Sequence, residues 1–181
     1  MVLVPGVPAL LPEYGGLVDP VADLRDACRA AVDWLGALEG PVRVVADPRG
    51  RRLGYRVAEH LLAEAGLVAE GSDAAVGSGA PGRAAAYLVV GNGSAKRTEK
   101  APGHLDPRAD GFDAALEAAL RGPDSAALAA LDEPLAAELW ADVAALRGLG
   151  GLLTGAGTAE VDYADDPFGV RYWVMRWTCA S

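Results

Sequence analysis

The stretch Ala85-Ala86-Tyr87-Leu88-Val89-Val90-Gly91-Asn92-Gly93-Ser94 carries the sequence signal that decides the fold. Its first part, Ala85–Val90, predicts a buried strand, because a short apolar run that ends at a glycine is typical of one. A polar segment, Gly91–Arg108, follows, and a helical pattern begins near Phe112. Strand, loop and helix in this order are typical of an α/β fold, in which ligands bind at the carboxyl ends of strands.

The chain before this stretch repeats the alternation of strand and helix. We expect strands at Val2–Val4 and Val42–Ala46. Asp19 and Pro20 suit the start of a helix whose apolar residues recur with helical spacing from Val21 to Leu38. A second helix is marked by Val57, Ala58, Leu61, Leu62 and Ala65 and ends at Gly66. The residues numbered 66–84 are rich in glycine and alanine, which predicts irregular structure.

The chain after this stretch predicts mostly helices and then two strands. A helix capped by Asp110 carries Phe112, Leu116 and Leu120 and is broken by Gly122-Pro123. Further helical stretches are expected around Leu128 and Leu131 and from Pro134 to Leu146, followed by a flexible loop, Gly148–Gly157. The last expected elements are two strands, Val161–Tyr163 and Gly169–Thr178, joined by a turn at Asp165–Phe168. Side chains in the last strand should alternate, with Arg171 and Trp173 opposite Tyr172 and Val174.

These elements predict an α/β fold with a central, mostly parallel sheet flanked by helices and an antiparallel pair near the end. No repeat or linker divides the chain, so we expect one domain over residues 1–181. The hydrophobic content of 51% is enough for a sizeable core.

Composition and charge exclude several classes of function. A net charge of -9 argues against nucleic acid, which requires a basic surface. No apolar run approaches the roughly 20 residues needed to span a bilayer, and the first residues, Met1–Pro5, lack the basic region of a signal peptide. Cys28 and Cys179 do not form a disulfide framework, and two free thiols indicate a reducing compartment. We therefore expect a cytoplasmic protein with no nucleic-acid or membrane partner.

The segment Gly91–Arg108 is the predicted functional site. It contains both lysines of the chain and one of its two histidines. Backbone and side-chain donors in a turn after a strand can hold an anion or a carboxylate, and lysines add charge. We expect a small-molecule ligand to contact Asn92, Gly93, Ser94, Lys96, Glu99, Asp106 and Arg108. The candidate catalytic residues are Ser94, Lys100 and His104, of which His104 would transfer protons. The alternative is a solvated stretch whose charges pair with one another.

Other motifs are weaker. Gly77–Gly82 matches the dinucleotide-binding string G-x-G-x-x-G, but it precedes a strand rather than following one and contains Pro81, so a flexible loop is the better interpretation. The nucleophile-elbow string is missing around Ser94. His60 has no second histidine four residues away, and a site with His104 and Asp106 lacks further ligands.

The segments together resemble a known family. Val4–Glu13, Gly91–Arg108 with Phe112-Asp113, and Tyr163–Val170 with Tyr172 are similar to the catalytic subunit of class III extradiol ring-cleavage dioxygenases. The resemblance is to the small actinobacterial proteins of this group, which also includes Memo-like proteins. It implies a dioxygenase-like α/β fold.

The resemblance also implies a difference at the metal site. In the true dioxygenases two histidines and a carboxylate hold non-haem iron, and a further histidine acts as acid and base. Here Gly6 occupies the position of the amino-terminal histidine, and His104 stands where the relatives have tyrosine. An ordinary site of two histidines and one carboxylate is therefore not expected, and neither is a bound cofactor.

Three functions remain open. The first is a dioxygenase-like protein with a degenerate iron site, which binds a small anionic or carbonyl-bearing ligand. Any catalysis by such a protein would be independent of a metal. The second is an active dioxygenase or hydrolase whose metal is held by His104, Asp106 and Asp165 or Asp166. The third is a non-catalytic interaction protein, a homodimer with Trp140, Trp173 and Trp177 at its surface.

Overall fold

A six-stranded sheet in the order β3-β2-β4-β1-β6-β5 forms the centre of the molecule. The structure is a computed structural model that describes residues 1–16, 18–38, 40–48, 53–72, 86–153 and 155–178. Its strands are β1 (Val2–Val4), β2 (Val42–Val45), β3 (Ala69–Ser72), β4 (Ala86–Val90), β5 (Glu160–Asp165) and β6 (Tyr172–Arg176). β1 to β4 pair in parallel, whereas β6 is antiparallel to both β1 and β5. The mixed sheet confirms the predicted α/β architecture and its antiparallel pair.

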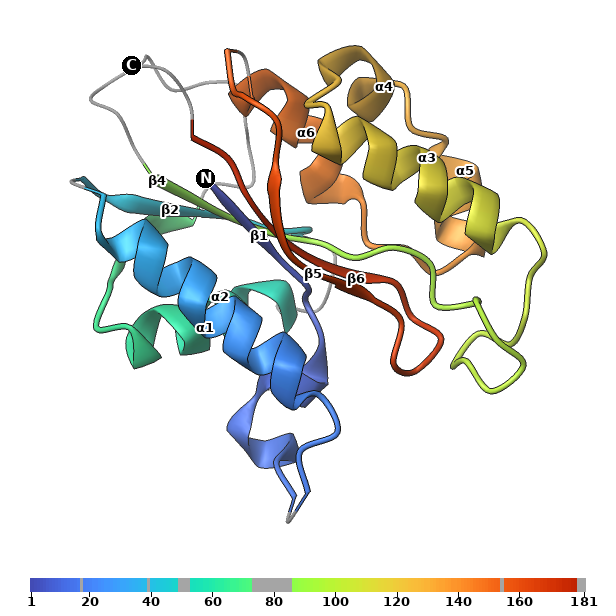
Figure 1. Cartoon of the computed structure of the whole chain (residues 1–181), viewed down its shortest axis with the longest axis horizontal. Coiled ribbons are helices and arrows are strands. Elements are labelled where there is room, and N and C mark those ends of the chain that lie inside the picture. The colour runs from blue at the N-terminus through green and yellow to red at the C-terminus, as the bar shows by residue number, and fades with distance from the viewer. Residues whose placement is uncertain (17, 39, 49–52, 73–85, 154, 179–181) are drawn as a thin grey trace.

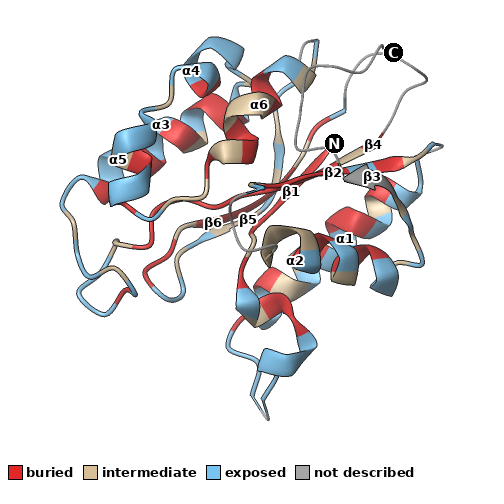
Figure 2. Ribbon diagram, turned by 180° about the vertical axis from the view of Figure 1, so that it is seen from behind, coloured by how far each residue is buried: buried red, intermediate tan, exposed pale blue. Residues whose placement is uncertain are grey.

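Helices cover both faces of the sheet (Figure 1). The first face is covered by α1 (Ala22–Gly36) and α2 (Leu53–Glu64). The second is covered by α3 (Ala109–Arg121), α4 (Ser125–Ala129), α5 (Glu133–Glu138) and α6 (Ala144–Leu152). Two short 3₁₀ turns, η1 (Pro8–Leu10) and η2 (Pro12–Tyr14), lie between β1 and α1. Buried residues line the inner side of each helical layer, so the protein has one apolar cluster on each face (Figure 2).

β6 shows how the sheet separates the two clusters. Tyr172 and Val174 belong to the cluster under α1 and α2, and Trp173 and Met175 belong to the cluster under α3 to α6. This arrangement confirms the predicted alternation, because successive side chains of a strand point to opposite faces.

β1 lies in the middle of the sheet, between β4 and β6, and all three of its residues are buried. The amino group of Met1 donates a hydrogen bond of 3.0 Å to the carbonyl of Trp177. The first and last described strands are therefore neighbours in the core.

α1 and α2 form where helices were predicted, but α1 begins only at Ala22 and its N-cap, Val21, has no side-chain cap, so Asp19 and Pro20 lie before the helix. Asp19 Oδ1 accepts a hydrogen bond of 3.0 Å from the N–H of Val21, directly before α1 begins. After α2, Gly66 has a φ of +69°, the left-handed conformation in which glycine commonly ends a helix. The irregular structure predicted for residues 66–84 is wrong where β3 forms, because pairing with β2 overrides the low strand propensity of Ala69–Ser72.

The helix predicted from Pro134 to Leu146 is wrong, because it is two helices. α5 ends at Glu138, and α6 begins only at Ala144. Between them, Asp142 forms an isolated bridge with Asn92. The expected flexible loop Gly148–Gly157 is wrong in its first part, because α6 continues to Leu152.

Glycine in α6 serves close helix packing. A Cβ at Gly150 would lie 2.9 Å from the Cα of Ser125, and the Ser125 hydroxyl donates a 2.7 Å hydrogen bond to the Gly150 carbonyl. Gly150 thus allows α4 and α6 to approach each other.

Asp110 does not cap α3, which begins one residue earlier, at Ala109. The preceding turn is set by Asp106, whose carbonyl accepts from the N–H of Ala109 and whose carboxylate accepts from the N–H of Arg108. Asp110 lies within the first turn, where a carboxylate still interacts favourably with the helix dipole.

Candidate functional site

β4 is the strand at which the covering helices change faces. The helices that follow its neighbours β1 and β2 pack on the first face, whereas α3, which follows β4, packs on the second (Figure 1). In open α/β sheets ligands bind outside the carboxyl ends of strands where the connections diverge in this way. The segment Gly91–Arg108 starts at this end of β4, so the topology makes it a candidate ligand-binding site.

Three glycines surround the end of β4. A Cβ at Gly6 would lie 2.8 Å from Val90 Cγ1, and one at Gly54 would lie 3.3 Å from the same atom. A Cβ at Gly91 would lie 2.8 Å from the carbonyl oxygen of Asp142. The backbone is therefore tightly packed here, and position 6 has no space for a larger side chain unless Val90 moves.

The inner part of the segment, Gly91–Ala95, is buried, and its backbone donors are all used inside the protein. The N–H groups of Gly91, Asn92, Gly93 and Ala95 bond to the carbonyls of Val4, Asp142, Arg171 and Leu139, at 2.9–3.1 Å. The N–H of Ser94 donates to Asp113 Oδ1 at 2.8 Å. The predicted donors therefore hold the fold together, and each of these N–H groups already has an acceptor inside the protein.

Ser94 is fully buried, and this contradicts its predicted roles in catalysis and ligand contact. Its hydroxyl donates to the carbonyl of Leu139 at 3.2 Å and accepts from the N–H of Lys96 at 3.0 Å. No hydrogen bond joins it to His104 within the described residues, so it has no base to activate it. Asn92 is also buried, and its amide donates to the carbonyl of Gly93 at 3.1 Å.

Arg97 ties the segment to two other parts of the chain. Its guanidinium bonds to Asp166 in the β5–β6 turn and to Asp113 in α3, the latter at 3.1 Å. It also lies 3.0 Å from Asp110. Burial raises the pKa of Asp113, although the N–H of Ser94 and Arg97 both favour its charged form. Sequence analysis missed this cluster, because only the fold brings its members together.

A second ion cluster lies against the inner part. Glu117 Oε2 accepts from Arg171 at 2.7 Å and from the indole of Trp173 at 3.0 Å, and Glu117 also pairs with Arg121. Burial alone would raise the pKa of Glu117, but hydrogen bonds from Trp173, Arg171 and Arg121 lower it to about 2. A Cβ at Gly93 would lie 2.8 Å from both Arg171 and Trp173 and 2.5 Å from Asp113, so only glycine fits there.

The outer part of the segment, Lys96–Arg108, carries the accessible charges. Lys96 is half-buried, and its ammonium lies 5.6 Å from the centre of the Trp140 ring. Lys100 is exposed. Within the part of the chain that the structure describes, neither lysine forms an ion pair.

His104 is exposed and adopts a φ of +60°, which is uncommon for residues other than glycine. Its Nδ1 lies 2.9 Å from the carbonyl oxygen of Glu99, an arrangement that requires Nδ1 to carry the proton when the ring is neutral. Nε2 is then the acceptor, and it has no partner among the described residues. The ring can thus accept a proton from solvent or from a ligand.

The predicted contacts Asp106 and Arg108 are engaged with each other. Arg108 donates to both carboxylate oxygens of Asp106, at 3.0 and 2.7 Å, and to Glu138 at 2.7 Å. Hydrogen bonds from Arg108 lower the pKa of Asp106 to about 2. Glu99 is exposed, and its carbonyl binds His104. The charged groups that stay available on the outer part are Lys96, Glu99 and Lys100.

The residues proposed as alternative metal ligands do not converge. Among the described residues, no three His, Cys, Asp or Glu side chains are placed to hold a metal ion. Asp166 binds Arg97, whereas Asp165 accepts from the N–H of Asp166 at 2.8 Å. His60 lies on α2, 3.7 Å from Glu64.

The tryptophans of the predicted dimer surface differ in exposure. Trp173 and Trp177 are buried in the core, so these two cannot contribute to such a surface. Trp140 is 57% exposed.

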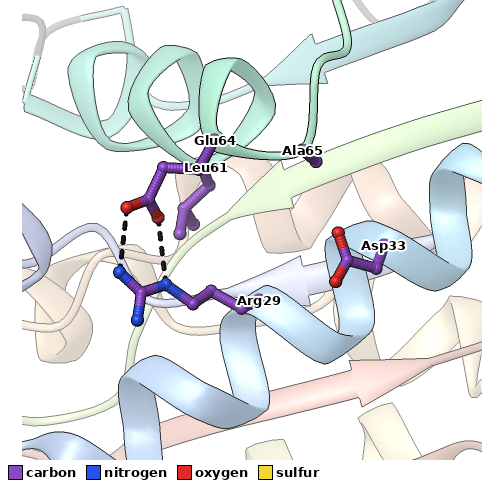
Figure 3. A pocket seen from close by; sticks show the side chains of 5 residues that line it. All are labelled: Arg29, Asp33, Leu61, Glu64 and Ala65. Atoms are coloured by element: carbon purple, nitrogen blue, oxygen red, sulfur yellow. Dashed lines mark hydrogen bonds and ion pairs between the residues drawn. The ribbon is translucent and has the colours of Figure 1, made fainter.

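A separate groove of about 310 Å³ lies between α1 and α2 (Figure 3). Its lining residues are Arg29, Asp33, Leu61, Glu64 and Ala65. Arg29 and Glu64 point toward each other across it and form two hydrogen bonds, of 2.9 and 3.2 Å. The groove lies on the first face of the sheet, and its central charges neutralise each other, so we do not assign a ligand to it.

Comparison with protein-family models and with curated proteins finds no match to this chain.

None of the helices in the described part is both long enough and apolar enough to cross a bilayer. The string Gly77–Gly82 and Cys179 lie outside the described residues, and Cys28 is a buried free cysteine.

Proposed function

We propose that the chain is a protein similar to class III extradiol dioxygenases that has lost the iron centre and binds a small anionic or carbonyl-bearing ligand. The ligand would contact the outer part of the segment, where Lys96 and Lys100 provide charge and His104 provides a proton acceptor. The observation that carries the proposal is the contrast among the cations of the segment. Arg97 and Arg108 form ion pairs with carboxylates, whereas the two lysines form none among the described residues, and Lys96 acts on Asp106 only through its charge.

The packing of the segment supports this role. Its inner part is fixed by internal hydrogen bonds, and Arg97 holds it to α3 and to the β5–β6 turn. A ligand that met Lys96 would therefore meet a largely pre-organised backbone, which reduces the ordering cost of binding.

Iron does not fit the residues present. The position that the resemblance assigns to a histidine is Gly6, and a Cβ there would already be 2.8 Å from Val90. His60 lies on α2 beside Glu64. His104 lies on the outer part of the segment, where its Nδ1 bonds to the carbonyl of Glu99. No step of the proposed function therefore involves a metal.

The proposal is tested by titrating the purified 181-residue chain with small carboxylates and keto acids at constant ionic strength. At least one of them should bind, and the double variant Lys96→Gln/Lys100→Gln should lose that binding. Arg29→Gln, which removes a cation on the other face of the sheet, is the matched control and should bind as the wild type does. If no compound binds the wild type, or if the double variant binds as well as the control, the proposal fails.

The iron-free site is tested separately. Protein purified without chelators should contain iron at far below one atom per chain. Stoichiometric iron would overturn that part of the proposal and favour the metalloenzyme.

A further inference from the structure

Trp140 occupies a position where the fold favours glycine. It follows the last residues of α5 and has a φ of +57°. The N–H of Ala141 bonds to the carbonyl of Ala136 at 2.9 Å, and the N–H of Trp140 bonds to that of Ala137 at 3.2 Å. These two bonds are the Schellman motif, which most often has glycine at the left-handed residue. A bulky side chain in this conformation is a genuine outlier.

The indole ring contributes little to the core in return. The residue is 57% exposed, whereas Trp173 and Trp177 are buried. The ammonium of Lys96 lies over the ring, 5.6 Å from its centre. A strained, exposed aromatic residue that the core does not require is a candidate for a functional role.

Lys96 is held in place over this ring. Its N–H bonds to the Ser94 hydroxyl at 3.0 Å, and its carbonyl accepts from the N–H of Asp106 at 3.0 Å. Gly103 packs against its side chain so closely that a Cβ would lie 2.5 Å from Lys96 Cγ. The stem of the lysine therefore packs against Gly103, and its ammonium lies over the indole. That ammonium forms no ion pair among the described residues, although its charge helps to lower the pKa of Asp106.

We infer that Trp140 is a binding residue and that Lys96 and Trp140 together recognise a planar carboxylate. The carboxylate would pair with the Lys96 ammonium while the flat part of the ligand stacks on the exposed indole. An aromatic ring gains from such stacking beyond the area it buries, whereas a puckered ring of similar size does not. This inference rests on the proposed function and specifies the chemical class of its ligand.

The test uses benzoate and cyclohexanecarboxylate, which carry the same charge and differ in planarity. Isothermal titration of the full chain at constant ionic strength should give tighter binding of benzoate. Trp140→Gly should weaken benzoate binding roughly fivefold or more, the size expected for an aromatic contact. Trp140→Phe should keep part of the affinity. Tyr14→Ala, which removes another exposed aromatic residue, should leave it unchanged.

Thermal unfolding of the same variants separates a binding role from a structural one. Because glycine suits the left-handed conformation, Trp140→Gly should have an unfolding temperature equal to or above that of the wild type. A clear fall in this temperature would show that the indole is needed for the fold and would overturn the inference. Loss of a concentration-dependent dimer in Trp140→Gly, with benzoate affinity unchanged, would also overturn it in favour of self-association.

The two proposals fail in different ways. If carboxylates bind and depend on the lysines, but planarity and Trp140 make no difference, only this inference is wrong. If no carboxylate binds the wild type, the proposed function itself is wrong.

Discussion

The inner and outer parts of the Gly91–Arg108 segment follow one another after the same strand but have opposite roles in the fold. Gly91–Ala95 is buried, and its donors bond to strands, helices and a buried carboxylate. Lys96–Arg108 lies mostly at the surface. Within the outer part, two adjacent cations also differ: Lys96 lies over an exposed indole, and Arg97 is enclosed by three carboxylates. Polar residues after a strand therefore do not by themselves indicate a ligand, since part of such a segment can serve the fold alone.

The largest effect should come from the cation that anchors the inner part. Arg97→Met leaves the buried carboxylate of Asp113 without its guanidinium, and removal of one partner of a buried pair costs about 3–5 kcal/mol. Urea unfolding measures this loss. Lys100→Met removes an exposed cation of the same segment and should change the free energy of unfolding by less than about 0.5 kcal/mol. Equal losses in the two variants would contradict the anchoring role of Arg97.

Acid should weaken the ion cluster behind the inner part. The pKa of Glu117 is lowered to about 2 in the folded protein from an ordinary value of 4.5, so its stabilisation is complete above pH 4.5. That stabilisation is lost as the pH falls from 4.5 toward 2, and a shift of this size corresponds to on the order of 3 kcal/mol. Unfolding free energies of the wild type and Glu117→Gln, measured across this range, should converge at the acid end. Glu138→Gln, at the surface, should run parallel to the wild type.

Gly93→Ala tests whether the inner part tolerates any side chain. The new Cβ would meet Asp113, Arg171 and Trp173 at 2.5–2.8 Å, and overpacking of this kind costs about 1–3 kcal/mol. Gly111→Ala is the matched control, because its Cβ would have no neighbour within 4 Å and its helical position favours alanine by roughly 0.5–1 kcal/mol. Opposite signs for the two variants, measured by thermal unfolding, are the expected result.

The smallest effect on stability should come from the outer part. Lys96→Ala removes a cation that makes one cation–π contact, and an exposed contact of this kind is worth about 0.5–1 kcal/mol. Calorimetry should therefore find a nearly unchanged unfolding temperature. A loss comparable with that of Arg97→Met would mean that Lys96 also belongs to the structural core of the segment.

Local patterns predicted the parts of the fold that local physics controls. Buried strands such as Val2–Val4 and Ala86–Val90 followed from apolar runs, and the alternation of Tyr172 and Trp173 followed from strand geometry. β3 could not be predicted in this way, because pairing with β2 rather than its own residues makes Ala69–Ser72 a strand.

The position of the Gly91–Arg108 segment at a strand end was predicted, but the hydrogen bonds of its residues were not. The segment does start at the strand end where the helices change faces. Nothing in Asn92, Gly93 or Ser94 reveals that their donors are already used, because the acceptors lie on residues such as Asp142 and Arg171, distant in sequence. Trp140 was expected inside a helix, whereas it follows the end of α5, and the sequence pattern did not mark that helix end.

The central place of β1 has a consequence for the rate of folding. The bond between Met1 and Trp177 spans 176 positions, and β1 pairs on its other side with β4. Contacts of this range require closure of long loops before they contribute stability, which slows folding. We expect β1 to remain unpaired along one edge until β6 docks, so that the hairpin of β5 and β6 controls when the sheet becomes complete. Substitutions at this hairpin should therefore alter the refolding rate more than equally destabilising ones in α2.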